Sequence, residues 1–267
     1  MTTDALRQCF APSADSYDRM MGRYLPELAP AFADAAGVRP GMRLLDVGCG
    51  PGGLTVELVR RSGAHRVAAV DPTPPFVEAC RSRNPGADIR QAAAESLPFA
   101  DGEFDAALAS LVVGFMKEPS TGIREMARVT APGGIVAACF WHHERMPALG
   151  LFWQAASSLD PSIAGDLRRP GATEGELPAL LAEAGLVDVE AGTIRASAEY
   201  ADFGDWWTAY TLGVGPIGGY YQSLRETHRE VLREECRELL GRPAGRFALE
   251  ATAWFARGVV ADAKGQR

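Results

Sequence analysis

Short apolar runs alternate with amphipathic segments along the first half of the chain. The runs have the length of buried strands and predict strands over residues 42–47, 66–71, 88–92, 104–110 and 135–141. Apolar residues at helical spacing predict helices between them, over residues 54–62, 75–83 and 121–129, with a Pro-Gly-Gly turn at 132–134. Strands and helices that alternate in this way form parallel sheets with right-handed crossovers. The pattern therefore predicts a doubly wound α/β fold.

The pattern changes after Trp141. Helical spacing predicts a helix over residues 147–160, and Thr173 with Glu176 matches a capping box that opens a helix ending near residue 184. Alternation predicts a strand over 186–194, and residues 247–255 resemble a last strand, with a helix as the alternative. With both strands, the expected sheet is mostly parallel and has seven strands. Glycines predict a loop over 213–219. A long amphipathic helix follows, with His228 as a core or cap histidine; its expected apolar side holds Leu224, His228, Val231, Leu232, Glu235 and Leu239.

These elements divide the chain into two parts. Residues 1–145 form a Rossmann-like core preceded by a helical segment over 4–38, and residues 146–267 supply the remaining strands. A helical cap is expected as an insertion at about residues 199–243. The chain has 267 residues, 47% of them hydrophobic, which suffices for one core with an elaborated cap.

Charge and cysteine usage narrow the class of protein. The net charge of -7 repels phosphate backbones, so a nucleic-acid partner is not expected. The chain shows no secretory signal and no apolar stretch of membrane-spanning length, so no membrane partner is expected either. Five scattered cysteines without a C-x-x-C pair favour a reduced, cytoplasmic protein. The four histidines lack zinc-site spacing, and no metal is expected.

The densest run of glycines follows the first predicted strand. Residues 48–53 read Gly-Cys-Gly-Pro-Gly-Gly, directly after the apolar run that ends at Val47. Glycines let the chain turn sharply and let a ligand lie against bare backbone, while the following helix offers free N–H groups. A turn of this composition at the carboxyl end of a strand predicts a cofactor-binding crevice.

Two acidic residues bear on which cofactor the turn holds. Gly48, Gly50 and Gly53 also satisfy the G-x-G-x-x-G pattern of dinucleotide sites, and Asp71 lies where a carboxylate can bind the ribose of either kind of cofactor. Asp46 precedes the first glycine, where its charge would repel a pyrophosphate but suit an ammonium and a sulfonium. The position of Asp46 favours S-adenosylmethionine.

Ordered motifs strengthen this interpretation. They are L-L-D-V-G-C-G-P-G at 44–52, V-D at 70–71, A-E-S-L-P-F at 94–99, F-D-A-A at 104–107, and R-E-M-A-R-V at 124–129 with P-G-G at 132–134. As a set they resemble the class I S-adenosylmethionine-dependent methyltransferases, in particular the ubiquinone/menaquinone C-methyltransferase-like subfamily. The resemblance covers about residues 14–141, and it departs from the family at Ala93, where the family commonly has Asp.

The resemblance implies a cofactor site spread over several elements. It assigns the methionine end to Asp46, the ribose hydroxyls to Asp71, and the adenine to Ala94 and Glu95. Tyr17 would fold over the cofactor. The full implied set is Tyr17, Asp46, Gly48, Gly50, Gly52, Asp71, Pro72, Ala94, Glu95, Ser110 and Leu111.

Methyl transfer from a sulfonium is an in-line displacement that needs positioning more than a fixed catalytic residue. A base is required only for a protonated acceptor, and the candidates are His142 and His143 at the end of the fifth strand. Residues 110–113 lack the Asn/Asp-Pro-Pro-Tyr stretch of methyltransferases that act on adenine or glutamine, which disfavours nucleic acids and protein amides as substrates. An oxygen, carbon or small-amine acceptor remains, and O- or C-methylation of a small molecule is favoured. Aromatic residues predict an apolar or flat acceptor, and the pocket candidates are Trp141, Trp206, Trp207, Tyr210 and Tyr220.

Two other functions stay open at this point. One is a non-catalytic S-adenosylmethionine-binding protein, because the chemistry needs no signature side chain. The other is a nicotinamide-dependent oxidoreductase built on the same glycine turn, which Asp46 disfavours. A homodimer also stays open as an alternative to a monomer.

Overall fold

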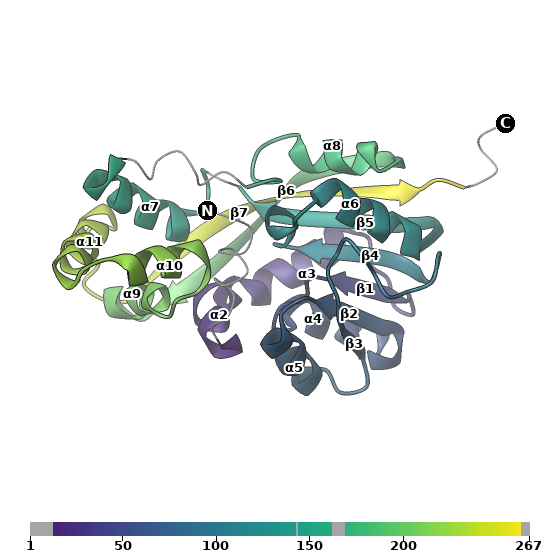
Figure 1. Ribbon diagram of the computed structural model, residues 1–267, viewed down its shortest axis with the longest axis horizontal. Helices are drawn as coiled ribbons and strands as arrows, with labels where there is room; N and C mark the ends of the chain where they lie inside the picture. Colours follow the sequence, from purple (N-terminus) through teal and green to yellow (C-terminus); the bar gives the residue numbers. More distant parts are fainter. Residues whose placement is uncertain (1–12, 143, 162–168, 263–267) are drawn as a thin grey trace.

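A seven-stranded sheet runs the length of the molecule, with helices on both of its faces and a helical cap at one end (Figure 1). The computed structural model describes residues 13–142, 144–161 and 169–262. The strand order is β3-β2-β1-β4-β5-β7-β6. The first five strands pair in parallel, and β7 runs antiparallel to both β5 and β6. The predicted fold class, a doubly wound and mostly parallel sheet of seven strands, is confirmed.

The strands lie close to their predicted positions. They are β1 (Leu44–Val47), β2 (Val67–Asp71), β3 (Asp88–Gln91), β4 (Phe104–Ser110), β5 (Thr130–Trp141), β6 (Leu186–Tyr200) and β7 (Phe247–Val260). The helices are α2 (Ala14–Met20), α3 (Leu25–Ala35), α4 (Gly53–Ser62), α5 (Pro74–Arg83), α6 (Pro119–Val129), α7 (Pro147–Leu159), α8 (Glu176–Glu183), α9 (Phe203–Thr211), α10 (Gly215–Ser223) and α11 (Glu226–Leu239). Across the described ranges, every helix is too short or too polar to span a membrane.

Each face of the sheet has its own apolar layer. Phe32 from α3 and Leu58 from α4 are fully buried on one face, and Met126 from α6 and Leu181 from α8 are fully buried on the other. β1 is buried along its whole length, as expected for a central parallel strand covered on both sides. The two layers hold the strands so that their carboxyl ends meet at one edge.

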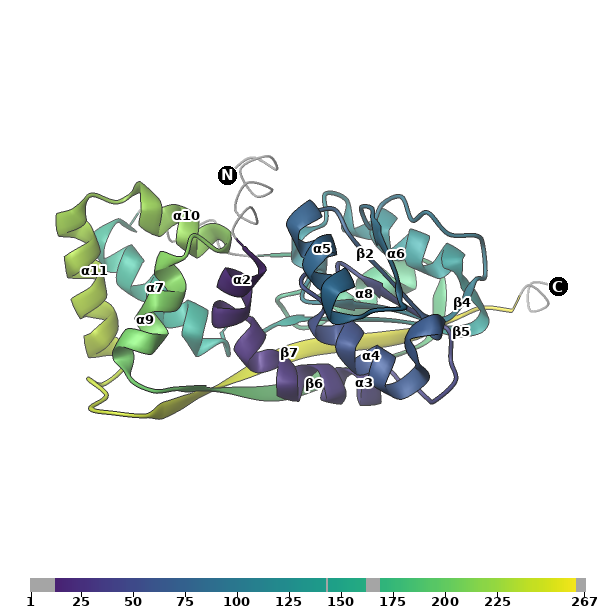
Figure 2. The ribbon, with the colours of Figure 1, turned by 90° about the horizontal axis from the view of Figure 1, so that it is seen from below.

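The cap is carried by the two longest strands. β6 and β7 pair from Leu186↔Val260 to Tyr200↔Phe247, and their distal ends extend beyond the rest of the sheet. Helices α9, α10 and α11 lie in the chain between these strands, and α7 joins them from the end of β5. Helix α2 lies between the cap and the part of the sheet that contains β1 to β4 (Figure 2).

Three details differ from the sequence prediction. α10 begins at Gly215, inside the expected glycine loop, because the glycines allow close packing: a Cβ on Gly218 would lie 2.2 Å from the backbone of Gly213. β5 begins at Thr130 and includes the expected turn at 132–134. The capping box is partial: Gly175 is the N-cap of α8, while the Glu176 carboxylate accepts from the Thr173 N–H at 3.3 Å.

The predicted apolar side of the long helix is also wrong in part. Leu232 and Cys236 are its buried residues, whereas Val231 is 51% exposed. His228 lies exposed in the first turn of α11, before the stripe that packs against α7, so it is not a core histidine.

Candidate functional site

The glycine-rich turn links β1 to α4 at the carboxyl edge of the sheet. Gly48, Gly50 and Gly52 all have positive φ angles, of 73°, 52° and 103°. Side chains rarely adopt this conformation, so the turn needs glycine at each place. A Cβ on Gly48 would lie 2.3 Å from Val112 Cγ2, whereas a Cβ on Gly50 would have no atom within 4 Å. Gly48 thus permits close packing, and Gly50 leaves bare backbone facing a cavity.

Replacement of Gly48 by alanine is expected to destabilise the fold by about 1–3 kcal/mol, because the methyl group adds an overlap with Val112 to the strain of positive φ. The measurement is chemical denaturation of the ligand-free protein. Gly133→Ala is the matched control, since Gly133 has a φ of 75° and a Cβ added there would have no atom within 4 Å. Equal losses in both variants would contradict the steric argument.

Asp71, at the end of β2, holds the turn in place. Its Oδ2 accepts from the Gly50 N–H at 3.0 Å, and its Oδ1 accepts from the Thr73 N–H at 2.8 Å. Burial raises the pKa of this carboxyl, opposed by the two backbone N–H groups. Each carboxylate oxygen retains a further lone pair, which suits it to accept from paired hydroxyls. Pro72 follows it on the rim of the same cavity.

Asp46, in β1, is the most deeply buried acid beside the turn. It is 1% exposed, and its Oδ2 accepts from the Thr55 hydroxyl at 2.6 Å. Its Oδ1 has no hydrogen-bond partner among the described residues. Burial raises the pKa of Asp46 to about 7, with the Thr55 hydrogen bond opposing and the charge of Asp71 adding to the rise. An unpartnered buried carboxylate oxygen fits a cationic group of a ligand.

Residues after β3 and β4 form the far side of the crevice. The Glu95 carboxylate accepts from the backbone N–H groups of Lys117 and Glu118, at 2.6 and 3.1 Å, and so ties the two loops together. Ala94 is buried next to it. Ser110 ends β4, and Leu111 follows with a φ of 58°, an uncommon value for a side chain of its size. These residues line the same cavity as the glycine turn.

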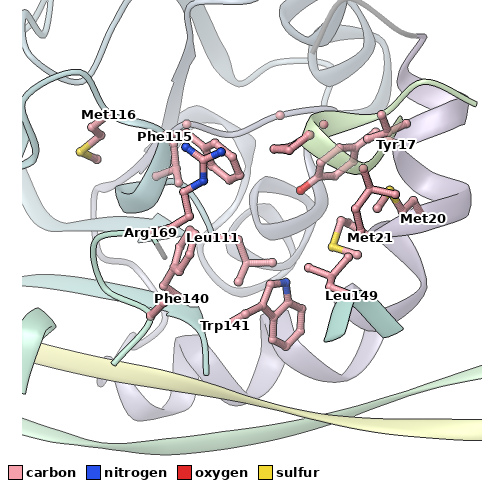
Figure 3. Close-up of a pocket in the computed structure, with 18 of the residues that line it drawn as sticks. Tyr17, Met20, Met21, Leu111, Phe115, Met116, Phe140, Trp141, Leu149 and Arg169 are labelled. Atoms are coloured by element: carbon pink, nitrogen blue, oxygen red, sulfur yellow. The ribbon is translucent and has the colours of Figure 1, made fainter. Parts of the chain in front are cut away.

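Tyr17 reaches the crevice from α2. Its ring packs edge-on against Phe76 of α5, with centroids 5.5 Å apart. Burial and the nearby charge of Asp71 raise the pKa of Tyr17, so its hydroxyl stays protonated. An ion pair links α2 to α5, because the Asp18 carboxylate lies 2.5 Å from the Arg83 guanidinium. Figure 3 shows the Tyr17 hydroxyl pointing into the cavity.

One cavity of about 1270 Å³ connects most of these residues with the cap, whereas Asp46 and Gly52 lie behind its wall and are not among the residues that line it. Binding sites for drug-sized ligands measure about 300–1,000 Å³, so this cavity has room for a cofactor and a second molecule. Beyond the cofactor candidates it is largely apolar (Figure 3). The lining there includes Met20, Met21, Leu149, Trp153, Ile217 and Tyr220.

The structure separates the aromatic pocket candidates into two groups. Trp141 and Tyr220 line the cavity. Trp206, Trp207 and Tyr210 are instead packed inside the cap, and they are at most 7% exposed. The Tyr210 hydroxyl donates to the Ala148 carbonyl at 2.6 Å, and its ring meets Trp206 edge-on. Trp207 and Tyr210 pack against Phe152 of α7, and all three residues are absent from the cavity wall.

Of the two histidine candidates for a catalytic base, His142 lies at the cavity. His142 lines the cavity and stacks on Trp254 with centroids 4.6 Å apart, while its Nδ1 accepts from the Glu144 N–H at 3.2 Å. His143 lies outside the described residues. Within the described ranges, no group of three His, Cys, Asp or Glu side chains is arranged to hold a metal ion.

Several lining residues were missed by the sequence interpretation. Met20 and Met21 come from the α2 region, Leu149 from α7 and Arg169 from the segment before α8. The sequence pattern identifies such residues only as apolar or polar positions of their own segments. Their contribution depends on how α2 and the cap meet, and no local pattern encodes that.

Comparison with known proteins agrees with this geometry. Residues 45–138 match the family model described as Methyltransferase domain. An uncharacterised protein of Mycobacterium tuberculosis is 33% identical over 149 residues, which are 54% of this chain and 52% of that protein. Malonyl-[acyl-carrier protein] O-methyltransferase of Pseudescherichia vulneris is 31% identical over 154 residues, 58% of this chain and 60% of that enzyme. The chain thus spans little more than half the length of these curated relatives.

Solved structures share the fold over a longer stretch. A crystal structure described as a methyltransferase from Bacillus halodurans has a TM-score of 0.57 at 17% identity, covering 88% of this chain and 99% of that one. The match over residues 45–138 and the shared fold support a methyltransferase domain with S-adenosylmethionine as its cofactor.

Proposed function

We propose that this protein is an S-adenosylmethionine-dependent methyltransferase that acts on a small, apolar or aromatic molecule. The observation that carries the proposal is the continuity of one cavity. It runs from the glycine turn and Asp71, across Leu111, to an apolar compartment under the cap. A site for the cofactor alone would not need this second compartment.

The residues present fit the cofactor by their chemistry. The unpartnered oxygen of Asp46 suits an ammonium group, and Asp71 retains lone pairs for ribose hydroxyls. When bound, the cofactor supplies an electrophilic methyl group on a sulfonium. The chain contributes orientation and exclusion of water, through the buried turn on one side and the apolar cap on the other.

The choice between oxygen and carbon as the methylated atom rests on similarity. The motifs resemble the ubiquinone/menaquinone C-methyltransferase-like subfamily, and one relative is named as an O-methyltransferase that acts on a malonyl carrier protein. We therefore favour O- or C-methylation, with His142 as the candidate base for an acceptor that carries a proton.

The first test of this function is a ligand-binding comparison. S-adenosylmethionine or S-adenosylhomocysteine at 100 times the dissociation constant should stabilise the protein by about 2.7 kcal/mol. For a chain of this size the melting temperature should rise by roughly 5–10 °C. NADH at the same concentration is the control. Stabilisation by NADH without stabilisation by either methyl-donor ligand would refute the proposal in favour of an oxidoreductase.

The second test separates an enzyme from a binding protein. Methyl-labelled cofactor is incubated with phenols, quinols, carboxylates and activated carbon acids, and label transfer is followed. We expect turnover with at least one class of apolar acceptor. Tight cofactor binding with no transfer to any class would favour the non-catalytic alternative.

A further inference from the structure

A buried hydrogen-bond donor that has no partner among the described residues lies in the wall of the apolar compartment under the cap, where the proposed function places the methyl acceptor. Trp141, the last residue of β5, is 6% exposed, and its indole Nε1 has no hydrogen-bond partner among the described residues. Figure 3 shows the nitrogen on the side of the ring that faces the cavity, toward the space between Leu111 and Leu149. A buried N–H that stays unpaired costs about 1–3 kcal/mol. The indole of Trp206 is buried and unpartnered in the same way, but Trp141 differs from it in lining the cavity, where a ligand atom can supply a partner.

Strand order separates this donor from Asp71, the residue that would bind the ribose of the cofactor. Asp71 ends β2 and Trp141 ends β5, with β1 and β4 between them. Three strand spacings separate the two residues by about 14 Å along the sheet edge. The turn and Asp46, on β1, lie between them. A ligand oxygen beside Trp141 therefore belongs to the second compartment of the cavity.

The surroundings of the indole limit what it can bind. Its ring meets Tyr24 edge-on with centroids 5.3 Å apart, which fixes the ring's orientation. Met21, Leu111 and Leu149 line the cavity beside it. An indole N–H donates and never accepts, so its partner must carry a lone pair. In apolar surroundings, a carbonyl or an ionised oxygen gains the most from one fixed donor.

We propose that the methyl acceptor is an apolar molecule that presents a carbonyl or ionised oxygen to Trp141 Nε1. This inference rests on the proposed function and narrows its substrate class. Trp141 is a specificity-determining residue: it favours acceptors that carry such an oxygen over molecules whose only polar group is a protonated amine, since an ammonium group has no lone pair to offer. The apolar body of the acceptor packs against the residues of α7 and α10, including Trp153 and Ile217.

The test compares Trp141→Phe with the wild-type protein, both saturated with S-adenosylhomocysteine. Two probes share one ring system: 2-naphthoate offers oxygen lone pairs, and 2-(aminomethyl)naphthalene offers only donors. Calorimetry should show that the wild-type complex prefers the carboxylate, and that the variant binds it at least about 10-fold more weakly. Binding of the amine should be unchanged by the substitution.

Trp206→Phe is the matched control. Its indole nitrogen is also buried and unpartnered among the described residues, but Trp206 does not line the cavity. This variant should bind both probes as the wild type does. The proposal is overturned if Trp141→Phe leaves naphthoate binding unchanged, if naphthoate fails to bind the wild-type complex, or if S-adenosylhomocysteine affinity falls with the probe affinity. Failure of the wild type to bind S-adenosylhomocysteine would instead refute the proposed function itself.

Discussion

Replacement of Asp71 by alanine is expected to weaken S-adenosylhomocysteine binding by about 100-fold or more. The carboxylate accepts from the Gly50 and Thr73 N–H groups, so it holds the turn and has lone pairs left for the ribose. Hydrogen bonds to a charged group contribute about 1.5–3 kcal/mol each, and two ribose hydroxyls would be lost at once. Isothermal titration calorimetry measures the change.

Loss of the carboxylate could also loosen the turn, and a second ligand distinguishes the two effects. The 2′-deoxy analogue of S-adenosylhomocysteine removes a hydroxyl from the ligand side. If Asp71 contacts the ribose, the analogue should bind less tightly than the parent ligand to the wild type, and equally with it to the variant. An equal penalty in both proteins would mean that Asp71 acts on the turn alone. Asp88→Ala, a half-exposed acid on β3, serves as the control for substitution itself.

The first half of the fold could be predicted because each of its elements is coded locally. β1 is buried throughout and is followed by glycines, and β4 begins and ends at the predicted residues, Phe104 and Ser110. Parallel strands covered on both faces produce short apolar runs that differ clearly from the helices between them. β5 begins before the predicted turn at 132–134 because β4 pairs with Thr130 and again with Ile135, and the register shift between these pairs contains the turn residues. The early pair at Thr130 is a tertiary contact that has no local signal in the sequence.

The cap was harder to predict because its helices are short and apolar on several sides. Trp206 and Trp207 are aromatic residues of the kind that often line a ligand site, yet both are buried inside the cap. Trp207 stacks on Phe152 of α7, and Trp206 packs against Trp207 on its own helix. Composition does not distinguish an aromatic residue that packs a cap from one that lines a cavity. Trp141 and Tyr220 reach the cavity because β5 ends there and α10 packs over it. Motif positions, by contrast, gather at one sheet edge as a direct consequence of parallel pairing.

A pH dependence of stability is the second large effect that the site implies. The pKa of Asp46 is raised to about 7 in the folded protein by burial, against an ordinary value of 3.8. Between those two pH values the folded state keeps a proton that the unfolded state has lost. The contribution of Asp46 to the free energy of unfolding therefore falls as the pH rises from about 4 to 7, by about 4 kcal/mol in total. Asp46→Asn should remove this part of the slope, which denaturation at several pH values measures, with the exposed Asp105→Asn as control.

The same carboxyl should make cofactor binding release a proton. An ammonium group beside the unpartnered oxygen of Asp46 favours the ionised form, so the bound state lowers the pKa that burial has raised. Below pH 7 the ligand-free protein holds this proton and must give it up, and affinity should rise with pH until Asp46 is ionised in the free protein as well. Calorimetry at pH 6 in two buffers of different ionisation enthalpy should detect the release in the wild type and not in Asp46→Asn. Equal release by both proteins would show that another group titrates, and that Asp46 does not face the cation of the cofactor.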